Sequence, residues 1–309
     1  MNEIKIFSPA TVANVSCGFD VLGFCLDSIG DEMVIRKTLE KGVKISKIEG
    51  ADLPYETNKN VAGVAALAIL EASNANFGVE IEIYKKIKPG SGIGSSSASA
   101  SGVVFAINEL LGKPFNKEQL TLFGMKGEAV ASGVEHADNV APGIFGGFTL
   151  VKSVNPLRII GLPTPTELYA TVIHPKIEIK TSEARAILPK QVNLSDAIKQ
   201  WANVGSLVSG LYTSDYDLIA DSLNDYIIEP FRSQLIPHFD KVKNAMMNAG
   251  ALGCGISGSG PSIFSLSKGL GTANKVAKEI NKIYSKTGIE FDIHVSKINT
   301  EGVRIVNSE

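Results

Sequence analysis

The stretch Lys88-Pro89-Gly90-Ser91-Gly92-Ile93-Gly94-Ser95-Ser96-Ser97-Ala98-Ser99-Ala100-Ser101-Gly102 decides how this chain folds. Just before it, residues 79–84 alternate between apolar and polar, which is the period of a strand with one buried face. Just after it, residues 103–111 are apolar enough for a buried helix, and Gly112 stands where a helix would end. The pattern therefore predicts that glycine and serine fill a turn from a strand into a helix.

A turn of this kind favours the binding of an anion. The first amides of a helix have no hydrogen-bond partners inside it, and the helix dipole adds partial positive charge there. Glycines let the backbone approach a ligand closely. The hydroxyls of Ser95, Ser96 and Ser97 can bind phosphate oxygens or a magnesium ion, a hard cation that prefers oxygen ligands. The stretch is therefore typical of a polyphosphate cradle.

Three alternatives explain the stretch less well. A Walker loop needs Gly-Lys-Ser or Gly-Lys-Thr at its end, and a dinucleotide fingerprint needs glycine where Ser95 stands. A flexible Gly/Ser linker seldom lies between a patterned strand and a helix-forming segment. A phosphate-binding turn of another type is the preferred interpretation.

Length and charge limit the class of protein. With 309 residues and 44% hydrophobic content, the chain can bury one large core or two ordinary ones, so a two-domain enzyme is expected. The formal net charge of −2 gives no reason to expect nucleic acid or an anionic membrane as a partner. Small molecules are the expected ligands.

Cysteine usage and the first residues indicate the compartment. Cys17, Cys25 and Cys254 are widely spaced without a Cys-x-x-Cys motif, so neither a disulfide framework nor a zinc site is predicted. Residues 1–6 lack the features of a signal peptide, and the apolar run 61–70 is too short to span a bilayer. We expect a cytoplasmic protein.

Two proline-containing segments, 155–156 and 161–166, interrupt all patterning. We therefore place a domain boundary there and expect domains at 1–160 and 161–309, the first with a mixed sheet and helices on one face. In the first domain strands are expected at 4–7 (an edge strand), 33–36, 43–48, 79–84 and 148–152, and helices at 60–72, 103–111 and 116–132. In the second, strands are expected at 168–173, 263–266, 291–295 and 303–306, and helices at 182–188, 195–212, 217–223, 237–248 and 273–284.

Glu128 is a candidate metal ligand. It lies in the helix that opens at Asn116 with a variant of the capping box, and no basic residue stands three or four positions from it. A carboxylate on a face of small apolar groups must find a cation elsewhere or shift its pKa. Magnesium held between Glu128 and a hydroxyl of residues 95–97 would meet that need. A glutamate facing solvent is an equally open alternative.

Polar side chains also gather in two predicted loops. Asn14 and Asp20 belong to the turn 8–20, and His136 and Asn139 belong to the loop 133–148. Loops on a rigid scaffold are where polar side chains reach ligands. Asn and Asp are also ordinary turn residues, and a single histidine is more often structural.

The second half offers two arginines and another glycine-rich turn. A planar guanidinium grips a carboxylate through two parallel hydrogen bonds, so Arg185 and Arg232 are candidates for binding an acid, although surface arginines are common. The turn 253–262 allows close approach of a ligand or of another backbone, with a plain hairpin as the alternative.

The segment from Pro89 to Ser99 resembles the ATP loop of the galactokinase, homoserine kinase, mevalonate kinase and phosphomevalonate kinase (GHMP) superfamily. Beyond the loop, the chain is similar to homoserine kinases along nearly its whole length. Residues 15–17 depart in detail from the run of small residues that the family has at this turn. The other matching pieces are 13–14 with 18–21, 60–63, 127–128, 136–142, 183–185, 229–232 and 255–262.

The resemblance implies ATP-dependent phosphorylation of the side-chain hydroxyl of L-homoserine, giving O-phospho-L-homoserine on the way to threonine. It implies an α+β fold of two domains: an N-terminal domain with a left-handed β-α-β crossover, which is an exception to the usual handedness, and a ferredoxin-like C-terminal domain. It also implies ATP and Mg2+ as cofactors and, because dimers are common in the family, a homodimer.

The resemblance further implies a role for each matching position. Glu128 with Ser96 would hold magnesium, Arg185 and Arg232 would clamp the substrate carboxylate, and the site would be closed from the second domain by the last glycine-rich turn. Around the amino group and hydroxyl of the substrate would stand Asn14, Asp20, His136 and Asn139. The ATP phosphates would be wrapped by Pro89, Gly90, Ser91, Gly92, Ile93, Gly94, Ser95, Ser96, Ser97, Ala98 and Ser99, with Gly258, Ser259 and Gly260 from the second domain.

Phosphoryl transfer passes through a loose transition state, so positioning and electrostatics carry most of the rate. Asp20 is the candidate for orienting the hydroxyl or accepting its proton, and orientation is favoured because a carboxylate is too weak a base to deprotonate an alcohol beforehand. Another kinase of the superfamily, acting on mevalonate or shikimate, is the nearest rival. A nucleotide-binding regulatory module without turnover is a rival from a different class.

Overall fold

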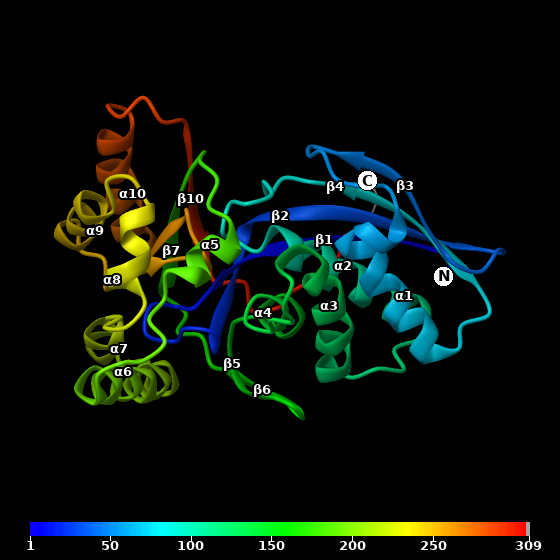
Figure 1. Cartoon of the computed structure of the whole chain (residues 1–309), viewed down its shortest axis with the longest axis horizontal. Helices are drawn as coiled ribbons and strands as arrows, with labels where there is room; N and C mark the ends of the chain where they lie inside the picture. Colours follow the sequence, from blue (N-terminus) through cyan, green and yellow to red (C-terminus); the bar gives the residue numbers. More distant parts are fainter. Residues whose placement is uncertain (307–309) are drawn as a thin grey trace.

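The computed structural model of the chain describes residues 1–306, apart from the side chain of Ser132. Within that range the strands form two sheets (Figure 1). The first sheet has the order β11-β1-β2-β4-β3, and the hairpin β5-β6 is attached to β2. Its strands are β1 (Glu3–Ala13), β2 (Leu22–Thr38), β3 (Val43–Glu49), β4 (Gly78–Tyr84), β5 (Phe148–Val154), β6 (Leu157–Leu162) and β11 (Arg304–Ile305).

The helices of this half lie on one side of the first sheet (Figure 1). Apolar side chains such as Ile35, Ile81, Ile69 and Val103 form the core between sheet and helices. The pair β3 and β4 is parallel and is connected through the first helix, so a β-α-β crossover is present as expected. The helices are α1 (Val61–Ser73), α2 (Ser95–Leu110), α3 (Lys117–Ser132) and α4 (Val140–Phe145), with a short 3₁₀ turn, η1 (Thr57–Lys59), before α1.

The second sheet has the order β10-β7-β9-β8 and is antiparallel throughout. In chain order its four strands are β7 (Leu168–Pro175), β8 (Gly253–Ile256), β9 (Ile263–Lys268) and β10 (Phe291–Lys297). Helices connect the first strand to the second and the third to the fourth, which is the β-α-β-β-α-β pattern of the ferredoxin-like fold. The two-domain GHMP kinase fold expected from the sequence is thus confirmed.

Helices α9 and α10 cover the outer face of the second sheet (Figure 1). Val242, Met246, Val276, Ile280 and Tyr284 fill the core beneath them. The helical elements of this half are α5 (Thr181–Ala186), α6 (Leu194–Thr213), α7 (Tyr216–Ser222), α8 (Glu229–Arg232), η2 (Ser233–Leu235), α9 (Phe239–Asn248) and α10 (Leu270–Tyr284).

The two halves share a core. The ring of Phe24 on β2 lies 4.9 Å from that of Phe148 on β5 and 5.8 Å from that of Phe264 on β9. The chain also returns at its end, because β11 pairs with β1 in the first sheet. Apart from β11, the strands of the first sheet end at Leu162 in β6, and those of the second begin at Leu168, so the chain first crosses between the sheets close to the expected boundary. The division at residue 160 stays a prediction.

Several boundaries differ from those expected. The first strand runs to Ala13 instead of residue 7, and it is no edge strand because β11 pairs with its other side. Every residue from Ser8 to Ala13 is buried, so the alternation that marks a half-buried strand is missing there. Helix α2 begins at Ser95 rather than at 103, and α4 lies within the predicted loop 133–148.

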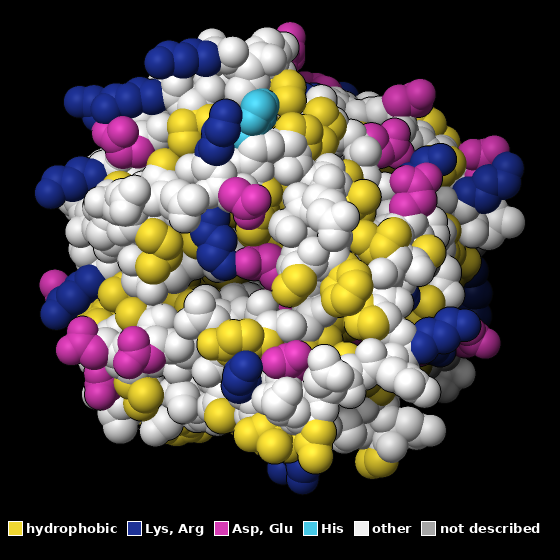
Figure 2. Space-filling view, turned by 60° about the vertical axis from the view of Figure 1, so that its left-hand side comes forward, with side chains coloured by type: hydrophobic (Ala, Val, Ile, Leu, Met, Phe, Trp, Pro, Cys, Tyr) yellow, Lys and Arg dark blue, Asp and Glu magenta, His cyan; other side chains and the backbone are white. Residues whose placement is uncertain are grey.

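The start signal of α3 was predicted correctly, and α1 likewise begins after a capping side chain. Asn60 caps α1 through its side-chain oxygen, and Asn116 with Gln119 forms the capping box of α3. Among the described residues, no helix combines the length and the apolar character needed to cross a bilayer. Basic and acidic side chains are interspersed over the face of the molecule shown in Figure 2.

Candidate active site

A cleft of about 610 Å³ lies where the two halves meet. The loop before α2 and the end of α3 form one side of it, and α5, Arg232 and the β8-β9 turn form the other. Most of the expected site residues line this cleft: Asn14, Asp20, Pro89, Gly90, Ser91, Gly92, Gly94, Ser95, Ser96, Ser97, Ser99, Glu128, His136, Asn139, Arg185, Arg232, Gly258 and Ser259.

The phosphate-loop candidate has the backbone that its glycines predict. Gly94 precedes the first residue of α2 with a φ of 70°, a conformation that favours glycine. A Cβ at Gly94 would lie 2.0 Å from Thr11 Oγ1, and one at Gly92 would lie 2.5 Å from the carbonyl oxygen of Gly260. Both positions therefore need glycine because of close approach as well as backbone conformation.

The β8-β9 turn holds this loop from the second half. Ser262 Oγ donates to the carbonyl of Ser91 at 2.6 Å, and Ser257 Oγ donates to the carbonyl of Gly92 at 2.7 Å. The glycine-rich turn at 253–262 is thus a hairpin, and it also packs directly on the loop. Two serines of the second half therefore hold the backbone of this loop.

Three residues of the expected cofactor set do not line the cleft. Ile93 and Ala98 are buried in the core, where the carbonyl of Ala98 accepts a hydrogen bond from Ser8 Oγ. Gly260 lies behind Gly92. The side chains of Ile93 and Ala98 therefore pack inside the protein, and the backbone of Gly260 packs against Gly92.

Glu128 is buried rather than exposed to solvent. Ser96 Oγ donates to one carboxylate oxygen at 2.7 Å, and Ser97 Oγ donates to the other at 2.8 Å. Burial raises the pKa of Glu128, and hydrogen bonds from the two serines and the charge of Lys85 oppose that rise. The carboxylate therefore lies at the first turn of α2, as a metal site there would require.

The donor set fits magnesium. Hydroxyl and carboxylate oxygens are hard ligands, and Mg2+ in phosphate sites commonly takes one or two protein ligands, with phosphates and waters completing the shell. Within residues 1–306, no group of three or more His, Cys, Asp or Glu side chains could hold a metal ion. The site therefore lacks the dedicated cage of a structural metal.

The opposite wall of the cleft is charged. Arg185 Nη2 donates to both carboxylate oxygens of Asp20 at 2.8 Å. Arg232 is buried, and it donates through Nε to the carbonyl of Ala184 at 3.1 Å and through Nη1 to that of Gly258 at 3.0 Å.

One aromatic ring brings the two arginines together. The guanidinium carbons of Arg232 and Arg185 lie 4.9 and 5.5 Å from the centroid of the Phe19 ring. Burial lowers the pKa of His136; the carboxylate of Asp20 raises it, and both guanidinium groups lower it further. Because these charges act on the same imidazole, the four ionisable groups form one cluster.

The two expected asparagines are both fixed. Asn14 Nδ2 donates to the carbonyl of Gly258 at 2.6 Å, and Asn14 Oδ1 accepts from the amide of Asp20 at 3.0 Å. Thr11 Oγ1 donates to Asn139 Oδ1 at 2.8 Å, and Asn139 lines the cleft. Residues that bind a small ligand benefit from such support, because less side-chain freedom is lost on binding.

The backbone at this wall is strained. Asn14, Val15, Ser16 and Asp20 all have positive φ values, of 73°, 41°, 58° and 59°. A β-branched residue such as Val15 adopts this conformation only when the surroundings force it. The departure from the family's small-residue run at 15–17 is thus absorbed by a strained but buried turn.

The sequence interpretation missed several lining residues. Asp138 stands between His136 and Asn139, and its burial raises its pKa to about 7. Because it lies between the two candidate residues of that loop, Asp138 could have been predicted as a site residue from the sequence. Lys85 directly follows β4, and no feature of the sequence marked it as a site residue. An apolar end of the cleft is formed by Leu53, Pro54, Val61, Val130 and Ala131.

Comparison with known proteins gives two family matches. Residues 60–147 match the family model of the GHMP kinases N-terminal domain, and residues 207–286 match that of the GHMP kinases C-terminal region. A homoserine kinase of Chlorobium phaeobacteroides (strain BS1) is 43% identical over 99% of this chain and 100% of its own length. One of Pyrococcus abyssi is 38% identical over 95% of this chain and 96% of its own.

Solved structures agree with these relatives. The crystal structure of homoserine kinase from Cytophaga hutchinsonii is 50% identical, covers 99% of this chain and 98% of its own, and superposes with a TM-score of 0.95. The structure of L. major mevalonate kinase in complex with R-mevalonate superposes with a TM-score of 0.72 at 16% identity, over 95% of this chain and 96% of its own. The second likeness extends to the fold alone.

Proposed function

The chain belongs to the homoserine kinases of the GHMP kinase family, and we propose how its cleft transfers a phosphoryl group from ATP to the side-chain hydroxyl of L-homoserine. The observation that carries the proposal is the arrangement of the cleft. A phosphate loop with Ser96 and Glu128 faces a wall that holds Asp20, Arg185 and Arg232. One wall suits a triphosphate, and the other suits a small zwitterion.

The nucleotide would lie along the first wall. The free amides of the first turn of α2 would donate to the phosphates, and the apolar end of the cleft near Pro54 and Val130 would take the adenosine. Ser96 and Glu128 would hold a magnesium ion between them. When bound, such an ion neutralises charge on the terminal phosphates.

Homoserine would bind at the second wall. Its carboxylate would be gripped by Arg185 and Arg232, since a guanidinium matches a carboxylate through parallel hydrogen bonds. Its ammonium group would pair with Asp20, whose carboxylate also forms an ion pair with Arg185. An amino acid that enters would thus meet both opposite charges, whereas mevalonate and shikimate lack the ammonium group.

Catalysis would rest on orientation. The loose transition state of phosphoryl transfer needs the hydroxyl in line with the transferred group, with developing charge stabilised by fixed donors. The Asn139 amide is one such donor, because Thr11 occupies its oxygen. Asp20 and Asn14 would orient the substrate from the side, and no strong base is required.

A coupled kinase assay with MgATP tests this function across L-homoserine, mevalonate and shikimate. We expect turnover with homoserine and little with the other two alcohols. Preference for mevalonate or shikimate would favour another kinase of the superfamily. Nucleotide binding without phosphate transfer to any alcohol would favour a regulatory module.

Three finer points are also proposals. Magnesium as the metal is supported by the hard oxygen ligands Ser96 and Glu128. A homodimer rests on what is common in the family, and a cytoplasmic location rests on the unpaired cysteines. Light scattering of the purified protein would test the homodimer through its molar mass.

A further inference from the structure

A buried ion pair lies directly behind the phosphate loop. Lys85 follows the last residue of β4, and Asp31 belongs to β2. Their side chains form an ion pair in which Lys85 is 1% exposed and Asp31 is not exposed at all. Burying two charges is expensive, and apolar residues of similar size often stabilise a core as well or better. The pair therefore calls for an explanation other than stability.

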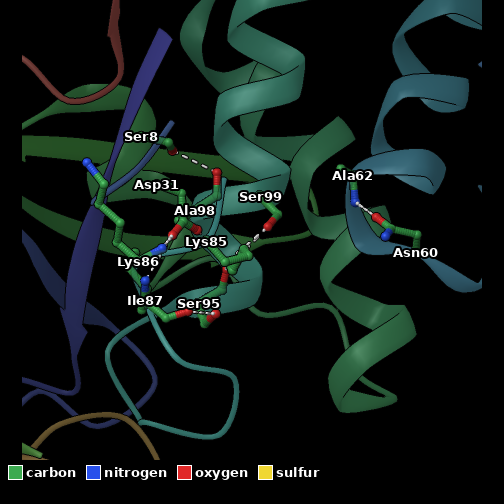
Figure 3. A network of polar contacts seen from close by, with 10 residues as sticks. All are labelled: Ser8, Asp31, Asn60, Ala62, Lys85, Lys86, Ile87, Ser95, Ala98 and Ser99. Atoms are coloured by element: carbon green, nitrogen blue, oxygen red, sulfur yellow. Dashed lines mark hydrogen bonds and ion pairs between the residues drawn. The ribbon is translucent and has the colours of Figure 1, made fainter. Parts of the chain in front are cut away.

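The Lys85 ammonium also contacts the start of α2. Besides Asp31, it donates to the carbonyl of Ser95 at 2.7 Å and to Ser99 Oγ at 3.2 Å (Figure 3). Ser95 is the first residue of α2 and Ser99 lies one turn later. An ammonium group has three protons, so all its donors are used. Lys85 borders the cleft but has no proton left for a ligand.

The Asp31 carboxylate fixes the other end of the loop. Its second oxygen accepts from the backbone amides of Lys86 at 2.8 Å and Ile87 at 2.9 Å (Figure 3). Ser95 Oγ in turn donates to the carbonyl of Ile87 at 2.8 Å. One network therefore ties the entry of the phosphate loop to its exit and to β2.

The Lys85–Asp31 ion pair has a defined direction relative to α2. Its positive end touches the first turn of α2, and its negative end points back to β2 and the loop entry. The free amides of that turn carry partial positive charge, and a buried charge beside them acts through a low dielectric. A positive group placed behind the amides strengthens an anion site without touching the anion.

We propose that Lys85, held by Asp31, is a positioning residue for the nucleotide: it fixes the first turn of α2 and places positive charge behind the amides that bind the phosphates. The inference rests on the proposed function, because it requires the nucleotide phosphates to bind at this loop. It adds two residues that belong to neither the phosphate loop nor the metal pair.

Lys85→Met tests the inference, because methionine keeps the length of the side chain and removes its charge. We expect KM for MgATP to rise roughly tenfold or more, with KM for homoserine within about twofold of the wild-type value. Binding of ADP should weaken in the same way. Binding of adenosine, which has no phosphates, should not change.

The double variant Asp31→Asn with Lys85→Met separates positioning from stability. Lys85→Met alone leaves the Asp31 carboxylate buried without its cation, which should lower the melting temperature. In the double variant asparagine still accepts from the Lys86 and Ile87 amides and no unpaired buried carboxylate remains, so the melting temperature should return toward the wild-type value. The weakened binding of ADP should persist. A double variant that binds ADP like the wild type would overturn the inference.

Lys243→Met is the control, since Lys243 also forms an ion pair, with Glu229 in the second half; these two side chains are 28% and 12% exposed and do not line the cleft. It should lower the melting temperature and leave KM for MgATP unchanged.

The proposed function and the inference about Lys85 would be contradicted by different results. A wild-type protein that does not phosphorylate homoserine contradicts the function, whereas an active wild type with unchanged nucleotide binding in Lys85→Met contradicts only the inference.

Discussion

At the scale of single residues, Arg185 links two roles in the cleft. It donates to both oxygens of Asp20, and among the described residues its buried Nε has no hydrogen-bond partner. The charged wall is therefore held together by its own hydrogen bonds, and one buried donor of Arg185 has no partner in the described part of the chain.

Arg185→Ala should weaken homoserine binding by roughly 2 to 5 kcal/mol and leave ATP affinity close to that of the wild type. Steady-state kinetics with each substrate varied in turn measures both. Arg304→Ala is the control, because Arg304 also pairs with an aspartate, Asp27, and lies over a phenylalanine ring, that of Phe7, but outside the cleft. Equal losses for both ligands in Arg185→Ala would contradict the clamp.

Glu128→Gln tests the metal pair. Glutamine keeps the size of the side chain and can still accept from a serine, but it lacks the negative charge that attracts a cation. We expect the Mg2+ concentration for half-maximal activity to rise roughly tenfold or more. Glu118→Gln, at the other end of α3, should behave like the wild type. An unchanged metal requirement in Glu128→Gln would rule out the ligand role.

At the scale of elements, α2 organises the first half. Its two ends both carry glycines with positive φ, Gly94 before it and Gly112 after it. Their surroundings differ, because a Cβ at Gly94 would meet Thr11 Oγ1 at 2.0 Å, whereas a Cβ at Gly112 would meet nothing within 4 Å. A comparison of the two glycines therefore distinguishes the cost of a positive φ, which both share, from the cost of a steric clash, which only Gly94 has.

Gly94→Ala should destabilise the protein more than Gly112→Ala does. Alanine in a left-handed conformation costs about 1 kcal/mol at either position, and at Gly94 the clash with Thr11 is added. Urea unfolding compares the two variants. Gly94→Ala should also impair ATP binding, which Gly112→Ala should leave intact. Similar unfolding free energies for both variants would show that the close approach carries no weight.

At the scale of the whole molecule, the cleft gathers carboxylates whose pKa is raised by burial, Glu128 and Asp138. Burial is the largest cause that raises the pKa of Asp138 to about 7 from an ordinary value of 3.8, and the charges of Asp20 and Glu128 add to it. The folded state therefore binds a proton between these values that the unfolded state releases. Stability from this group is present at low pH and is lost as the pH rises through about 7.

Asp138→Asn should remove this dependence. The wild type should lose unfolding free energy between about pH 4 and pH 7 relative to the variant, because asparagine carries no proton to release. Urea unfolding of both proteins across that range measures the difference. Parallel curves for the two proteins would show that Asp138 does not titrate as its burial implies.

The local signals in the sequence were reliable because their interactions span few residues. The capping box joins Asn116 to Gln119, three positions away, and the alternation before the glycine-rich stretch is visible within residues 79–84. The length of the first strand was not predictable, because residues 8–13 are buried on both faces by elements far away in the sequence.

What the sequence by itself determined is the glycine-rich loop, its place between a strand and a helix, and the family to which the chain belongs. Only the tertiary structure decided that Arg185 meets Asp20 across 165 positions of sequence, that Glu128 turns inward to Ser96, and that Lys85 and Asp31 lie behind the loop. Backbone hydrogen bonds and caps act between near neighbours, and a sequence records them directly. Burial and ion pairing depend on which distant segments pack together, within the first half for Lys85 with Asp31 and between the two halves for Arg185 with Asp20.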